Sequence, residues 1–192
     1  MSVKTMFMEH ISNSPFSEHF RNHGIVFNEK NEIDTSIDYF EEIEIRRFTN
    51  ADITDVVELY KDVFTAEPWN DVWISEEQVE YYLNELVENP VFDGFVVYEN
   101  SLLLAACFGH KRSWWNGKEF FIDELFVANQ MQGKGIGSKL LEYVEKDLLM
   151  DDYFRITLLT NKNLPAEEFY LKQGFNIIQN RIIMAKNILK RY

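Results

Sequence analysis

Cysteine is nearly absent from this chain of 192 residues, because Cys107 is the only one. A lone cysteine cannot form an intrachain disulfide, and the N-terminus shows no long apolar leader, so we expect a cytoplasmic protein in a reducing compartment. No apolar run reaches the roughly 18 residues that a membrane-spanning helix needs. We therefore expect no membrane partner.

Basic residues are scarce as well, since 19 Lys and Arg stand against 32 Asp and Glu, for a formal net charge of -13. The imbalance lies in residues 1–120, which carry 23 of these acidic residues and only 9 of the basic ones. Carboxylates repel a phosphate backbone, so nucleic acid is not an expected partner. The acidity either keeps the protein in solution or faces a cationic partner, and composition alone leaves both open.

Histidine is the third scarcity, and three of the four, His10, His19 and His23, lie within the first 40 residues. His19 and His23 stand one helical turn apart, but two histidines without a third ligand do not make a metal site, and we predict none. Residues 1–40 are expected to form an N-terminal extension. Residues 41–192 are expected to form one domain.

Strand and helix periodicities alternate along residues 41–192. Alternating or continuous apolar residues predict strands at 42–48, 92–100, 101–114, 120–128, 153–160, 175–179 and 181–188. Helical spacing and caps predict helices at 49–64, 75–89, 136–150 and 164–173. Helices placed between the strands of one mixed sheet indicate an α/β or α+β fold.

Glycine is sparse except in the run Gln132–Gly137, where three of the eight glycines fall within five positions. The nucleotide P-loop pattern does not fit this run. The dinucleotide pattern G-x-G-x-x-G also fails, because Ser138 or Leu140 stands where the third glycine belongs. The pattern Q-x-x-G-x-G remains. A strand, a glycine turn and a helix N-terminus in that order form an anion site, although a plain tight turn is the alternative.

The glycine loop belongs to a longer motif, with the strand "IDELFVA" before it and the helix "SKLLEYVEK" after it. A second motif, "NLPAEEFYLKQGF" at residues 163–175, has the spacing N-x-x-A-x-x-x-Y-x-x-x-G-F. Both motifs resemble those of the GNAT superfamily of acetyl-CoA-dependent N-acetyltransferases. The resemblance covers about residues 42–187. It implies a mixed, mostly antiparallel sheet flanked by helices on both faces, with acetyl-CoA as co-substrate.

The resemblance also implies which residues hold acetyl-CoA. Backbone N–H groups of the glycine loop would bind the pyrophosphate, the preceding strand would pair with the pantetheine arm and polarise the thioester near Val127, and Asn163 would contact the arm. These positions are Leu125, Phe126, Val127, Gln132, Gly133, Lys134, Gly135, Ile136, Gly137, Ser138 and Asn163.

Acetyl transfer needs a base that deprotonates the amine and an acid that protonates the leaving thiolate. Tyr170 matches the family's tyrosine acid. The base is either Glu124 or Asp123, with Glu124 favoured slightly. Because the two are adjacent in a predicted strand, we expect their side chains to point to opposite faces, so that only one reaches the acetyl group.

The acceptor site is expected in the connection between the first two helices and in the hairpin before the central strand. Aromatic walls with carboxylates suit a cation, so a small amine such as a polyamine or an aminoglycoside is the expected acceptor. The candidate residues are Glu67, Trp69, Asp71, Trp73, Trp114 and Trp115. A protein N-terminus or lysine is an alternative acceptor, and a non-catalytic acyl-CoA-binding module is an alternative function. A homodimer is also a possible assembly.

Overall fold

The computed structural model describes residues 43–188, so the predicted extension at residues 1–40 lies outside the described residues and its boundary stays a prediction. The chain divides into two compact units between Thr157 and Leu158, and each unit is described by itself. No helix of residues 43–188 is long and apolar enough to cross a membrane.

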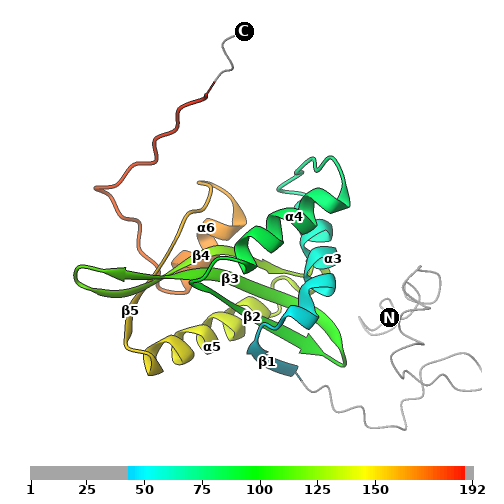
Figure 1. Ribbon diagram of the computed structural model, residues 1–192, viewed down its shortest axis with the longest axis horizontal. Helices are drawn as coiled ribbons and strands as arrows, with labels where there is room; N and C mark the ends of the chain where they lie inside the picture. The colour runs from blue at the N-terminus through cyan, green and yellow to red at the C-terminus, as the bar shows by residue number, and fades with distance from the viewer. Residues whose placement is uncertain (1–42, 189–192) are drawn as a thin grey trace, which may run out of the picture. The chain divides into compact units, whose positions relative to one another are not determined.

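A five-stranded sheet in the order β1-β2-β3-β4-β5 forms the centre of the first unit (Figure 1). The pairings β1–β2, β2–β3 and β3–β4 are all antiparallel. The elements are β1 (Ile43–Arg47), η1 (Asn50–Asp52), α3 (Ile53–Phe64), α4 (Glu76–Val87), β2 (Phe92–Glu99), β3 (Leu102–Trp114), β4 (Gly117–Val127), η2 (Asn129–Met131), α5 (Ile136–Met150) and β5 (Tyr153–Leu158). The expected order of strands and helices is confirmed as far as β5.

Helix α4 shows why the sequence folds this way locally. Ser75 is its N-cap, and the Ser75 hydroxyl accepts a hydrogen bond of 3.3 Å from the backbone N–H of Gln78. The Gln78 side chain returns a bond of 2.8 Å by accepting from the Ile74 backbone N–H. Side chain and backbone thus satisfy two orphan donors of the helix start, in a variant of the capping box.

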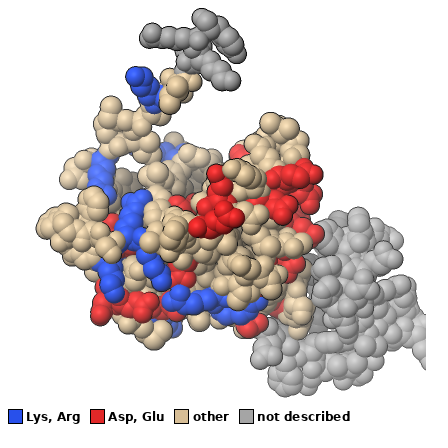
Figure 2. Space-filling view, in the orientation of Figure 1, with Lys and Arg blue, Asp and Glu red and all other residues tan. Residues whose placement is uncertain are grey.

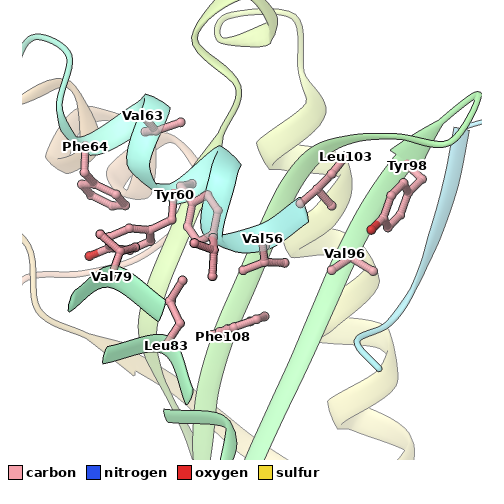
Figure 3. Packing of buried hydrophobic residues seen from close by; sticks show 13 residues of the cluster. Val56, Tyr60, Val63, Phe64, Val79, Leu83, Val96, Tyr98, Leu103 and Phe108 are labelled. Carbon is pink, nitrogen blue, oxygen red and sulfur yellow. The ribbon is translucent and has the colours of Figure 1, made fainter. Parts of the chain in front are cut away.

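Helices α3 and α4 cover one face of the sheet through an apolar cluster (Figure 3). Val56, Val79 and Leu83 are fully buried there and pack against Phe108 of β3. Each such aliphatic side chain contributes about 1.5–3 kcal/mol through its removal from water. The burial also fixes the position of the two tyrosines of these helices that are described below.

Helix α5 supplies the other layer. Its residues Leu140, Leu141 and Val144 are buried, and the Tyr143 ring lies 6.1 Å from that of Phe95 in β2. Phe95 is adjacent in the strand to Val96, which belongs to the cluster under α3 and α4. Successive strand residues face opposite ways, so helices lie on both faces of the sheet, as expected.

An ion-pair network around the buried Asp93 ties this sheet to α5. The Asp93 carboxylate accepts bonds of 2.7 Å from Arg47 and lies 2.9 Å from the Lys111 ammonium. Arg47 also pairs with Asp147 of α5. Asp93 is only 7% exposed, so its charge depends on these two cations for compensation.

The second unit contains α6 (Pro165–Lys172). Gly174, two residues beyond the helix, has a left-handed conformation with φ of 87°. The strands predicted at 175–179 and 181–188 are wrong, because residues 175–188 form no strand. Alternating apolar side chains mark a segment that can pair, but a strand exists only where a partner backbone bonds to it. Here Ile182 and Met184 stay 83% and 84% exposed.

Candidate functional site

The two carboxylates proposed as the base sit at an irregularity in β4. Phe108 of β3 pairs with Glu124, but the next residue, Gly109, pairs with Ile122. Asp123 is therefore an extra residue without a partner in β3, which is a β-bulge. The bulge removes the strict alternation on which the expectation of opposite faces rested.

Contacts of the two carboxylates show the consequence of the bulge. Glu124 is bonded to tyrosines of the two helices that cover Phe108, whereas Asp123 lies 2.7 Å from the ring of His110. Phe108 and His110 are two residues apart in β3 and so share a face. The structure therefore brings both carboxylates to the α3–α4 side of the sheet, and the expectation that only one could reach that side is wrong.

Glu124 is half-buried beneath α3 and α4. Its carboxylate accepts a hydrogen bond of 2.5 Å from the Tyr82 hydroxyl and a longer one of 3.4 Å from Tyr60. Loss of solvation, with a smaller contribution from the charges of Asp123 and Asp71, raises the pKa of Glu124 to about 7, although the two tyrosine bonds oppose this rise. A carboxylate that titrates near neutral pH is suited to accept and release a proton there.

Tyr60 and Tyr82 were missed by the sequence reasoning. Tyr60 is part of the buried apolar stripe of α3, and Tyr82 adjoins the exposed Tyr81 in α4. Burial and the neighbouring Glu124 charge raise the pKa of both phenols, which therefore remain protonated donors. A tyrosine within an amphipathic helix is the one local signal that points to them, because a buried hydroxyl requires a partner.

Two of the four tryptophans, Trp69 and Trp73, pack against the apolar cluster that contains Tyr60. The Trp73 ring centroid lies 5.8 Å from those of both Tyr60 and Tyr82. The indole N–H of Trp73 is buried and has no acceptor among the described residues. Trp69 packs on Phe64, with ring centroids 5.4 Å apart. A buried donor without a partner is a place where a ligand atom or water can bind.

The remaining acceptor candidates are more exposed. Glu67 and Asp71 lie on the surface of the α3–α4 connection. Trp114 and Trp115 are 53% and 88% exposed at the β3–β4 hairpin. That hairpin end lies at the far side of the sheet from the α3–α4 connection (Figure 1). The structure therefore does not bring the hairpin tryptophans together with Trp69 and Trp73.

The glycine loop leads from β4 into α5. Gly133 and Gly135 have φ of 72° and 84°, a left-handed conformation that glycine adopts without strain, and a Cβ on either would meet nothing within 4 Å. The Gln132 side chain braces the loop by donating a bond of 3.1 Å to the Val127 carbonyl. The loop surface beside both glycines is thus open.

The first turn of α5 presents backbone N–H groups as hydrogen-bond donors. The helix begins at Ile136, and its N-cap Gly135 has no side chain that could bond to the first turn. The N–H groups of Ile136, Gly137 and Ser138 find no acceptor within residues 43–188. Lys134 adds a cationic side chain to the loop. Free N–H groups at the positive end of a helix dipole attract anions such as phosphates.

The start of β4 lies beside β5 in the first unit. Gly117 of β4 lies beside Phe154 of β5, and Glu119 pairs with Arg155 at 3.1 Å. Leu125, Phe126 and Val127 lie at the other end of β4, directly before the glycine loop. Their contact with the pantetheine arm stays a prediction.

The other two candidates belong to the second unit. Asn163 has a left-handed φ of 64°, and its backbone N–H donates to Glu167 at 2.7 Å. Tyr170 of α6 is buried, with its ring 5.4 Å from that of Phe175. The roles that the motif implies for Asn163 and Tyr170 stay predictions.

Comparison with known proteins identifies the class of this fold and site. The acetyltransferase (GNAT) family matches residues 53–175, and the chain belongs to that family. A comparison with curated proteins found no match.

Solved structures of similar fold include aminoglycoside N-acetyltransferase AAC(6')-Iy in complex with CoA, which is 14% identical with a TM-score of 0.63 and is matched over 79% of this chain and 99% of its own. A possible acetyltransferase from Clostridium difficile 630 is 17% identical with a TM-score of 0.67, over 78% and 100%. The aminoglycoside acetyltransferase meta-AAC0020, from an uncultured soil metagenomic sample and in complex with sisomicin, is 16% identical with a TM-score of 0.59, over 77% and 97%. At these identities the likeness establishes the fold.

Proposed function

We propose that this protein transfers the acetyl group of acetyl-CoA to a primary amine of a small cationic acceptor, with Glu124 as the general base. The observation that carries the proposal is the half-buried Glu124 carboxylate, bonded to Tyr60 and Tyr82 and with a pKa raised to about 7. A purely structural carboxylate would gain more from an arginine or lysine partner, and among the described residues Glu124 has none.

The donor site extends along β4 and the glycine loop. The N–H groups of Ile136, Gly137 and Ser138, which have no acceptor among the described residues, bind the pyrophosphate of acetyl-CoA. The backbone of residues 125–127 bonds to the pantetheine arm. This places the thioester near the bulge at Asp123 and Glu124. The neighbour in complex with CoA has the same fold, which supports this assignment.

The chemistry follows from the protonation states. An alkylammonium has a pKa near 10, so one proton passes from it to Glu124 before the nitrogen lone pair can attack the thioester carbon. The C–N bond forms, the C–S bond breaks, and CoA leaves as a thiolate. Tyr170 gives that thiolate a proton and regains one from the acylated nitrogen, which leaves a neutral amide, CoA and a protonated Glu124.

Charge favours a cationic acceptor. Asp and Glu side chains gather at the upper right of Figure 2, where Figure 1 places α4 and its connection to α3. The first turn of α4 alone carries Glu76 and Glu77. Such a field raises the local concentration of cations, and Trp73 beside Tyr82 offers aromatic faces to them. Polyamines and aminoglycosides have the required amines, and two structural neighbours are aminoglycoside acetyltransferases.

The test is release of CoA thiol from acetyl-CoA with a panel of polyamines, aminoglycosides and lysine peptides. Glu124→Gln keeps the shape but cannot accept the proton, and we expect kcat/KM to fall by about 10²- to 10⁴-fold. Glu145→Gln, an exposed carboxylate of α5, is the matched control and should leave the rate unchanged.

Full activity of Glu124→Gln would refute the base assignment. Binding of acetyl-CoA with no thiol released for any amine would instead favour a non-catalytic acyl-CoA-binding module.

A further inference from the structure

Three side chains on β3 and β4 form a hydrogen-bonded chain that ends on Asp123. The Arg112 Nε–H donates to His110 Nε2 at 3.0 Å, and His110 Nδ1 lies 2.7 Å from Asp123 Oδ2. Phe121 pairs with His110 across the strands, and its ring packs against the side chains of His110 and Arg112. Its ring lies 5.2 Å from the imidazole and 4.3 Å from the guanidinium carbon.

The direction of each bond follows from the donors. A guanidinium has N–H groups and no acceptor, so His110 Nε2 must accept from Arg112. A neutral imidazole then carries its proton on Nδ1, and that N–H donates to the Asp123 carboxylate. His110 is thus held in a defined orientation and tautomer, and its Nδ1–H fixes the orientation of the Asp123 carboxylate.

The side chains of His110 and Asp123 are 20% and 21% exposed, so both are accessible to a ligand from solvent. The bulge brings Asp123 to the same side of the sheet as Glu124. The two carboxylates differ in their partners. Among the described residues Glu124 accepts from two phenols, whereas Asp123 bonds to an imidazole that is itself bonded to an arginine.

The geometry points to His110 and Arg112 as positioning residues of the transfer site, which hold the Asp123 carboxylate in place to bind the ammonium group of the acceptor beside Glu124. This inference rests on the proposed function and divides the work between the two carboxylates. Asp123 binds the cation. Glu124 takes the proton. Both roles require a carboxylate whose orientation is fixed by its hydrogen-bond partners.

The kinetic test separates binding of the amine from the rest of catalysis. His110→Phe keeps an aromatic ring on Phe121 but removes both nitrogens, and we expect KM for the amine to rise about tenfold or more, since a charge-assisted bond is lost. KM for acetyl-CoA should stay unchanged. His110→Asn retains an amide donor near Nδ1 and should restore most of the amine affinity. Ser113→Ala, an exposed change in the same strand, is the control.

A spectroscopic test needs no turnover. Nitrogen-15 NMR of the full chain should show the neutral imidazole of His110, assigned by comparison with His110→Phe, as the Nδ1–H tautomer. Arg112→Ala should increase the share of the Nε2–H tautomer, which dominates in free imidazoles. An Nε2–H tautomer in the wild-type protein would overturn the inference.

The outcomes distinguish this inference from the proposed function. If Glu124→Gln loses activity while His110→Phe leaves the amine KM unchanged, the positioning role fails and the base assignment stands. Equal rises of KM for His110→Phe and His110→Asn would also overturn it, because the donor would not matter. If no amine is acetylated, calorimetry with spermidine and kanamycin as probes replaces the kinetic assay. Equal affinities of the wild type and His110→Phe for these amines would then refute the positioning role.

Discussion

Replacing Tyr82 by phenylalanine tests how the site controls the Glu124 proton. The Tyr82 hydroxyl donates to Glu124 at 2.5 Å and so stabilises the ionised carboxylate. A hydrogen bond to a charged group contributes about 1.5–3 kcal/mol, and about 1.4 kcal/mol corresponds to one pKa unit. Removal of the bond should therefore raise the pKa of Glu124 from about 7 by about one to two further units.

The effect on rate has a definite sign. Glu124 acts as a base only when ionised, so kcat/KM rises as pH rises through its pKa. With the pKa raised by one to two units, the ionised fraction at pH 7 falls by about five- to fiftyfold, and kcat/KM falls with it. The activity should return near pH 9.5. Tyr60→Phe should shift the profile less, because its 3.4 Å bond is weak.

The assay is thiol release measured from pH 5.5 to 9.5 with one amine at low concentration. Tyr81→Phe provides a matched control on the same helix, since Tyr81 is 67% exposed. The groups that face Glu124 are Tyr60 from α3, Tyr82 from α4, Asp123 from β4 and Asp71 from the connection. A downward shift in Tyr82→Phe, or an equal shift in Tyr81→Phe, would refute the reasoning.

Two further predictions concern the donor site and the fold. Gly135→Glu places a carboxylate where the pyrophosphate should lie, at a residue with φ of 84°, and should abolish acetyl-CoA binding in calorimetry. Unchanged binding would contradict the loop assignment. Asp93→Ala leaves Arg47 and Lys111 without their shared buried anion and should lower the free energy of unfolding by about 2–3 kcal/mol in urea titrations. Asp151→Ala, at a 52% exposed partner of Arg47, should cost less than about 0.5 kcal/mol.

Much of the fold could be predicted from local signals. The caps and apolar stripes located α3, α4 and α5, and the alternation located the first five strands, because these patterns repeat over a few residues. The two strands predicted at 175–188 are absent from the structure, so the same signals failed there. Their alternation shows what such a segment could bury, whereas a strand depends on a partner backbone elsewhere in the chain.

The candidate site was predictable only in part. The sequence pointed to Glu124 and Asp123 but placed them on opposite faces, since alternation is the default for adjacent strand residues. The bulge that breaks this alternation depends on how β3 pairs with β4. No residue type in β4 predicts the bulge. The four tryptophans were grouped by their shared chemistry, but the structure separates those of the hairpin from those of the α3–α4 connection.

The sequence by itself determined the family. It also predicted the place of an anion site, because the run Gln132–Gly137 combines a loop and a helix start within a few consecutive residues. Tertiary structure alone decided the surroundings of Glu124. Tyr60, Tyr82 and His110 come from three separate elements, and only packing of α3 and α4 on the sheet brings two of these side chains to one carboxylate. Desolvation by those helices, which raises the pKa of Glu124, likewise exists only once the core has formed.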